Sequence, residues 1–222
     1  MGVTIEELRV GDAPEAWAAL GFAVDGDACV IGDVRVRLAG ADPGKGLTGW
    51  SLRDFGGGEL DGLPTDRADP PSPAEAPVHP NVVAAEAPVH SNGITAIDHV
   101  VAISSDLDRT VAALGAAGLD LRRIREEPTP AGAPRQAFFR LGAVILEVVQ
   151  APEEAIERTG GDRPAFFWGL ALVTPDLEAT VVGLGDRAGE IRPAVQPGRR
   201  IATLRRSAGL TVPVALITPS QR

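Results

Sequence analysis

The sequence has few of the residue types on which many functional sites depend. Its 222 residues include one cysteine, no tyrosine and three histidines. Because Cys29 is the only cysteine, an internal disulfide and every metal site built from several thiolates are excluded. The glycine-rich stretches around Lys45 and at 56–58 have neither the Walker spacing nor a following helix, and no nucleophile elbow is present.

Long apolar runs and an excess of positive charge are also missing. No run approaches the roughly 18 apolar residues of a membrane span, and the N-terminus lacks a signal-peptide pattern, so we expect a cytoplasmic protein without a membrane partner. The formal net charge of −9 argues against nucleic acid as a partner. Arginines cluster at 121–126 and 198–206, where acidic and apolar residues alternate with them. We interpret these clusters as solvent-exposed strand faces.

A duplicated pattern dominates the second half of the chain. Residues 97–124 and 167–194 each contain an apolar run, then an aspartate in N-cap position, Asp106 or Asp176, then a helical pattern. Each unit ends in two strands joined by a glycine-containing turn. Both units therefore predict the order strand, helix, strand, strand, strand.

A weaker third copy opens the chain, with Gly32 and Asp33 as its hairpin turn. A segment rich in proline and alanine follows it, and we interpret His79 and His90 as linker residues there. The expected fold class is α+β, with paired βαβββ modules forming a curved mixed sheet around a half-barrel cleft. The predicted divisions are an N-terminal βαβββ-like module at 1–63, a linker at 64–93, a first module at 94–150 and a second at 151–222.

His99 and Glu147 are the principal candidate site residues. His99 lies in an apolar strand, and strand alternation places it on the face opposite Asp98. Glu147 lies among apolar residues, and a buried carboxylate needs a partner. We predict that His99 and Glu147 meet. They could bind a divalent metal ion (Zn, Fe, Mn or Ni), form a structural hydrogen bond, or act as a base and its orienting group.

These features resemble the vicinal oxygen chelate superfamily, which includes glyoxalases, bleomycin-resistance proteins and extradiol dioxygenases. The motifs are "IDHVVAISSDL" with His99 and "ILEVV" with Glu147, and the resemblance covers residues 94–219, and 1–62 more weakly. It implies a divalent metal held by the first and fourth strands of each module, where it acts as a Lewis acid. The second pair of ligand positions falls on Gly169 and on Val214 or Ala215, none of which can bind a metal.

Additional ligands would have to come from elsewhere. The candidates are a second subunit or the side chains of Glu6, Glu7, His79 and His90. The scarce aromatic residues offer a substrate pocket or simple core packing. The predicted pocket residues are Phe138, Phe167, Trp168 and Gln136.

Two functions remain open at this point. The resemblance implies a metal-dependent lyase, isomerase or dioxygenase that acts on a small molecule with adjacent oxygens, with His99 and Glu147 as catalytic and metal-binding residues. The alternative is a metal-free protein that binds or sequesters a small molecule, as bleomycin-resistance proteins do. The missing second ligand pair favours this alternative slightly. An opening module without an internal partner either packs against a sheet edge or pairs across a homodimer, because an exposed edge invites association.

Overall fold

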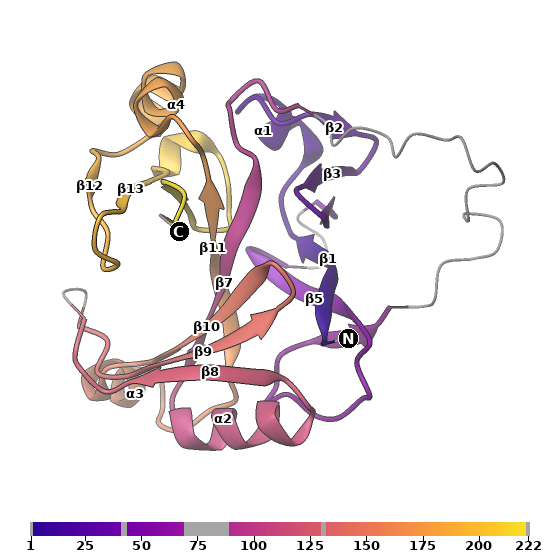
Figure 1. Cartoon of the computed structure of the whole chain (residues 1–222), viewed down its shortest axis with the longest axis vertical. Coiled ribbons are helices and arrows are strands. Elements are labelled where there is room, and N and C mark those ends of the chain that lie inside the picture. Colours follow the sequence, from indigo (N-terminus) through magenta and orange to yellow (C-terminus); the bar gives the residue numbers. More distant parts are fainter. Residues whose placement is uncertain (1, 41–43, 69–88, 130–131, 221–222) are drawn as a thin grey trace, which may run out of the picture.

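The computed structural model describes residues 2–40, 44–68, 89–129 and 132–220. These residues form two open mixed sheets with few helices (Figure 1), so the predicted α+β class is confirmed. The strand orders are β2-β3-β4-β1-β5-β6 in the six-stranded sheet and β12-β13-β14-β11-β7-β10-β9-β8 in the eight-stranded sheet. No helix within the described ranges is long and apolar enough to cross a membrane.

The eight-stranded sheet consists of two βαβββ modules, as the sequence predicts. In each module the last strand pairs in parallel with the first, and the modules join through the antiparallel pair of β7 and β11. The first module comprises β7 (Ala96–Ser104), α2 (Leu107–Ala116), β8 (Asp120–Arg125), β9 (Gln136–Leu141) and β10 (Val144–Gln150). The helix α3 (Glu153–Arg158) leads to the second module: β11 (Phe166–Val173), α4 (Leu177–Leu184), the 3-10 turns Gly185–Arg187 and Arg206–Ala208, β12 (Arg192–Pro193), β13 (Arg200–Thr203) and β14 (Val214–Ile217).

The start of each module helix repeats the same local chemistry. The Asp106 carboxylate accepts the backbone N–H of Arg109 at 3.0 Å, and the Asp176 carboxylate accepts that of Ala179 at 2.9 Å. Both aspartates are therefore N-caps, as predicted. A buried hydroxyl pair lies at the same offsets from each cap and has the same length of 2.7 Å, namely Ser104 with Thr110 and Thr174 with Thr180.

The six-stranded sheet follows the same scheme in shortened form. Its strand β4 runs parallel to β1, β5 runs antiparallel to β1, and β6 runs parallel to β5. The strands β5 and β6 thus occupy the places that β11 and β14 hold in the other sheet, but residues 54–64 between them contain no helix or strand. The elements are β1 (Thr4–Val10), α1 (Pro14–Ala18), β2 (Val24–Asp25), β3 (Ala28–Ile31), β4 (Val34–Leu38), β5 (Leu47–Arg53) and β6 (Thr65–Arg67).

The predicted linker contains both a strand and an anchored histidine. The strand is β6, whereas residues 69–88, including His79, lie outside the described residues. His90 is buried; its Nδ1 accepts the Ala23 N–H at 3.0 Å, and its Nε2 faces the Val30 carbonyl oxygen at 3.0 Å. Burial lowers the pKa of His90. Because both ring nitrogens are hydrogen-bonded to backbone, His90 fastens the chain to the N-terminal sheet and has no free nitrogen for a metal.

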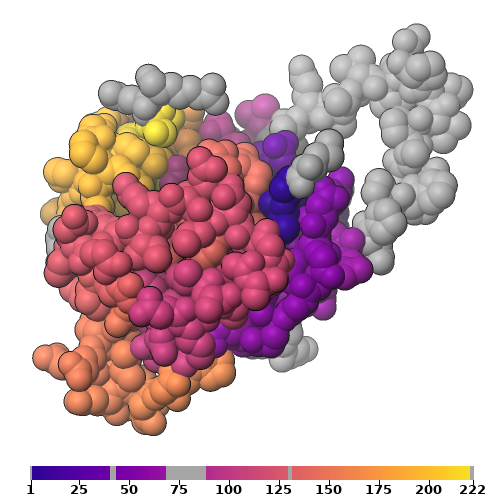
Figure 2. Space-filling view, turned by 60° about the horizontal axis from the view of Figure 1, so that its bottom comes forward, coloured from indigo at the N-terminus to yellow at the C-terminus, as the bar shows by residue number. Residues whose placement is uncertain are grey.

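The two sheets pack against each other through one apolar core. Trp50 of β5 is fully buried, and its ring meets that of Phe167 on β11 edge-on, with the ring centroids 4.9 Å apart. In Figure 1 the N-terminal sheet lies beside β7 and β11. In the space-filling view of Figure 2 the first module covers the centre of the visible face, with the indigo and purple N-terminal residues to one side.

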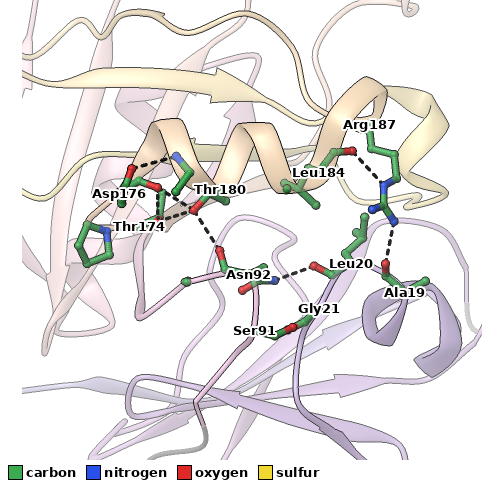
Figure 3. A pocket seen from close by; sticks show the side chains of 14 residues that line it. Ala19, Leu20, Gly21, Ser91, Asn92, Thr174, Asp176, Thr180, Leu184 and Arg187 are labelled. Atoms are coloured by element: carbon green, nitrogen blue, oxygen red, sulfur yellow. Dashed lines mark hydrogen bonds between the residues drawn. The ribbon is translucent and has the colours of Figure 1, made fainter.

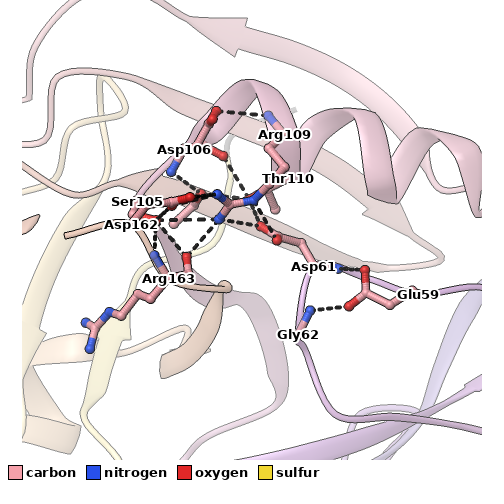
Figure 4. A network of polar contacts seen from close by, with 10 residues as sticks. Glu59, Asp61, Gly62, Ser105, Asp106, Arg109, Thr110, Asp162 and Arg163 are labelled. Atoms are coloured by element: carbon pink, nitrogen blue, oxygen red, sulfur yellow. Dashed lines mark hydrogen bonds and ion pairs between the residues drawn. The ribbon is translucent and has the colours of Figure 1, made fainter. Parts of the chain in front are cut away.

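A polar cluster around Arg109 also connects the modules (Figure 4). The Arg109 guanidinium of α2 donates to Asp61 at 2.8 Å, to Asp162 at 2.6 Å and to the Arg163 carbonyl oxygen at 2.7 Å. Asp61 belongs to the loop after β5, and Asp162 precedes β11. This one side chain therefore holds three separate parts of the chain together.

Candidate functional site

His99 and Glu147 lie beside each other on adjacent strands. The parallel register of β7 and β10 pairs His99 with Ile145 and Glu147 with Val101, so both site residues face the same side of the sheet. The distance from His99 Nε2 to Glu147 Oε2 is 3.3 Å. Each side chain is 14% exposed, so the pair is largely shielded and still accessible from solvent.

The pair lies on the face of the eight-stranded sheet that is turned away from the N-terminal sheet. Figure 1 shows this sheet curving from β8 through β7 to β13, with α2 and the N-terminal sheet on its outer side. Residues of the outer side, such as Val100, Phe139 and Leu146, are fully buried. We call the inner side, which carries His99 and Glu147, the concave face.

Asp98 joins His99 because of a β-bulge. The antiparallel register of β7 and β11 places His99 opposite Ala171 and Ile97 opposite Leu172, which leaves Asp98 as an extra residue. The Asp98 carboxylate accepts His99 Nδ1–H at 2.8 Å. The prediction that Asp98 points away from His99 is therefore wrong, since alternation is interrupted at this position.

Arg199, a residue of the second module, holds Asp98 in its position beside His99. Its guanidinium donates to both carboxylate oxygens of Asp98, at 2.6 and 3.2 Å, and only 7% of the Arg199 side chain is exposed. Burial raises the pKa of Asp98, but the hydrogen bonds from His99 and Arg199 outweigh it and hold the pKa below its usual range. The Asp98 carboxylate thus holds a proton on His99 Nδ1, so Nε2 is the ring nitrogen that faces Glu147.

Glu147 has the opposite electrostatic environment. Burial raises its pKa, and the nearby charge of His99 and the hydrogen bond from Gln136 offset this only in part. A carboxyl group with a raised pKa therefore faces His99 Nε2. This arrangement can give up or accept a proton at either group, which is the chemistry of an acid–base pair.

The four predicted pocket residues occupy different environments. Gln136 and Phe138 share the concave face, and the Gln136 amide donates to Glu147 Oε1. Gln136 is 7% exposed, and its Oε1 has no hydrogen-bond partner among the described residues. Phe167 pairs with Ala102 on the outer side and packs on Trp50, so the structure places it in the core. Trp168 is the extra residue of a second bulge and is 49% exposed.

The donor set does not fit a tightly held metal ion. A Cβ atom added at Gly169 would lie 2.6 Å from the Pro213 carbonyl oxygen, so no side chain of a ligand fits there. Ala215 lies in register with Ala171, on the concave face, and brings no donor atom, while Val214 is buried. Within the described ranges no three His, Cys, Asp or Glu side chains are arranged to hold a metal. Two donors, His99 and Glu147, fall short of the three or four of protein metal sites.

Three of the additional ligand candidates lie within the described residues and are engaged elsewhere. Glu7 pairs with Arg35 at 3.3 Å and with Arg37 at 3.2 Å, and Glu6 pairs with Arg53. His90 is bonded to backbone through both nitrogens. The described candidates therefore add no ligand to His99 and Glu147.

A hollow of about 430 Å³ lies away from this site, between α1, residues 91–93 and α4 (Figure 3). Its polar side chains are already bonded across it. Asn92 donates to the Leu20 carbonyl oxygen at 3.0 Å, the Thr180 hydroxyl donates to the Asn92 carbonyl oxygen at 3.0 Å, and Arg187 donates to the Ala19 carbonyl oxygen at 2.7 Å. The hollow is thus part of the contact between the N-terminal sheet and the second module.

Comparison with known proteins identifies the class of fold. No family model and no curated protein matches the sequence. A methylmalonyl-CoA epimerase from Mycobacterium tuberculosis has a similar structure, with 20% identity and a TM-score of 0.50 over 60% of this chain and 94% of that chain. A xylose isomerase-like TIM barrel/4-hydroxyphenylpyruvate dioxygenase fusion protein matches 99% of this chain at 14% identity and a TM-score of 0.62. This chain covers 49% of the fusion protein, about half its length.

These likenesses agree with the paired modules and the parallel closing strands. The chain has the fold of the vicinal oxygen chelate superfamily. At these identities the likeness concerns the fold alone, and the function has to be argued from the site.

Proposed function

We propose that the concave face binds a small molecule and exchanges a proton with it through His99 and Glu147, without a resident metal ion. The observation that carries this proposal is the 3.3 Å contact between His99 Nε2 and Glu147 Oε2 on a partly accessible face. Proton transfer of this kind is a step of isomerase and lyase reactions. Asp98 and Arg199 act as positioning residues, because they fix the orientation of the imidazole.

One further observation supports a ligand on this face. The Gln136 Oε1 atom is a buried acceptor without a described partner, and such atoms are rare in folded proteins. A hydroxyl or N–H group of a ligand would satisfy it. Glu147 and Gln136 would therefore contact the same end of the bound molecule.

The donors present support a function without a resident metal ion. Metal ions in proteins commonly have three or four protein ligands, and here Gly169 and Ala215 replace the second pair. An imidazole and a carboxyl group with a raised pKa can exchange protons without a metal. The metal-dependent alternative predicts that binding disappears when divalent ions are removed.

The test combines a binding screen with a matched pair of variants. Untagged protein treated with a chelator would be screened by ligand-observed NMR against small hydroxy and oxo compounds, and deuterium uptake from solvent would report proton exchange. Glu147→Gln should abolish the exchange, whereas Glu157→Gln, at an exposed position of α3, should leave it unchanged. Binding without exchange in the wild type would favour a non-catalytic binding protein. Binding that His99→Ala leaves intact, or that requires added Zn, Mn or Ni, would contradict the proposal.

A further inference from the structure

Two arginines of the outer strand β8 share the concave face with the site. The antiparallel register of β8 and β9 pairs Arg123 with Phe138 and Arg125 with Gln136. Phe138 in turn lies opposite Glu147 on β10. Facing partners in a sheet lie on the same side, so Arg123 and Arg125 point to the side of Glu147. Arg123 is exposed, as predicted for the arginine cluster at 121–126, and Arg125 is partly buried.

Arg123 lies over the Phe138 ring and has no acidic partner within the described part of the chain. Its guanidinium carbon lies 4.9 Å from the centre of the Phe138 ring, which is a cation–π arrangement. Neighbouring arginines differ, since Arg122 pairs with Asp120 at 3.2 Å and Arg125 has only a 3.7 Å contact with the exposed Glu127. The Arg123 charge is therefore available for a ligand.

The local charge on this face is opposite to that of the whole protein. Arg123 and Arg125 are positive, burial raises the pKa of Glu147, and the charge of Asp98 is compensated by Arg199. An anion that approaches the concave face meets positive charge although the formal net charge of the chain is −9.

We propose that the molecule bound on the concave face is a small organic anion whose carboxylate or phosphate-type group pairs with Arg123, next to Glu147 and His99. This inference rests on the proposed function. Strands lie about 4.8 Å apart, so the backbones at Glu147 and Arg123, two strands apart, are separated by roughly 10 Å. The Arg123 side chain shortens this span by reaching over Phe138. The anionic group of the ligand is therefore only a few bonds away from the other end of the ligand, which contacts Gln136 and exchanges the proton.

The test uses three probes of nearly the same shape. Pyruvate carries a carboxylate, acetylphosphonate carries a phosphorus oxyanion, and pyruvamide is neutral. Ligand-observed NMR titrations on the full chain should show at least one anion binding roughly ten-fold or more tightly than pyruvamide, as expected for a charged hydrogen bond. Arg123→Gln should remove this preference. Arg122→Gln, which changes a neighbouring arginine that is paired with Asp120, should retain it.

The outcomes separate this inference from the proposed function. If all three probes bind equally and His99→Ala abolishes their binding, the anion preference is refuted and the proposed function stands. If Arg123→Gln keeps the preference, Arg123 is not the recognition residue and the inference fails. If His99→Ala leaves every probe bound as before, both proposals fail. If no probe binds to the wild type, recognition of small organic anions is refuted. The relative affinities of pyruvate and acetylphosphonate decide between a carboxylate and a phosphate-type group.

Discussion

Replacing Arg199 tests the support that holds His99 in place. Arg199 is 7% exposed, donates to both oxygens of Asp98, and donates through Nε to the Thr218 carbonyl oxygen at 2.8 Å. The variant Arg199→Met removes the guanidinium but keeps most of the apolar stem. It leaves Asp98, of which 19% is exposed, with a carboxylate that has lost its cationic partner.

The expected loss of stability follows from these contacts. Removing one partner of a buried ion pair typically costs about 3–5 kcal/mol, and the partial exposure of Asp98 favours the lower end, about 3 kcal/mol. The lost hydrogen bond to Thr218 adds about 1 kcal/mol. The double variant Asp98→Asn/Arg199→Met leaves no unpaired charge, so it should lose only about 1–2 kcal/mol.

Urea unfolding near pH 7, followed by tryptophan fluorescence, measures these differences. Trp17 and Trp50 are fully buried and report on unfolding of the N-terminal sheet and of the core shared by the two sheets. Arg192→Met, at an exposed position of β12, is the control and should change the free energy of unfolding by less than about 0.5 kcal/mol. The reasoning is refuted if Arg199→Met loses less than about 1 kcal/mol, or if the double variant is less stable than Arg199→Met alone.

Three other substitutions test separate parts of the argument. Because burial raises the pKa of Glu147, its ionisation destabilises the folded state as pH rises above the usual glutamate range. Glu147→Gln should therefore be more stable than the wild type near pH 7 and gain nothing at about pH 4, measured by urea unfolding at both values. Gly169→His should destabilise the fold by about 1–3 kcal/mol and bind no stoichiometric Ni²⁺ by calorimetry, because its Cβ meets the Pro213 backbone. Trp50→Ala should lose about 3–5 kcal/mol and lower the melting temperature, since it opens a cavity beside Phe167.

The sequence predicts the architecture well because the duplicated modules can be recognised from patterns within short segments. An N-cap aspartate, a helical period and a turn are features of short segments, and Asp106 and Asp176 both act as expected. The meeting of His99 and Glu147 also follows from the pattern, since the parallel pairing of the first and last strands brings them together. The cytoplasmic location and the homodimer stay predictions.

Other parts of the site depend on contacts between distant residues, which cannot be predicted from local sequence patterns. Asp98 reaches His99 only because a bulge interrupts the strand, and Arg199 reaches Asp98 from 101 residues further along the chain. Phe167 lies in the core because the register with β7 turns it to the outer side. His90 belongs to a segment without periodicity, and only its two hydrogen bonds reveal its position.

The N-terminal sheet helps to explain why the candidate site belongs to the other sheet. Its first strand also carries a partly buried acid, Glu7, which lies opposite Arg35 on the parallel strand β4. The two arginines Arg35 and Arg37 compensate the Glu7 charge, and Asp27 contacts both of them, so these groups satisfy one another. The position opposite His99 on β10 is Ile145 instead, and Glu147 has no arginine within ion-pair distance among the described residues. A shared strand order thus gives a closed network of ion pairs in one sheet and leaves an acid–base pair available for a ligand in the other.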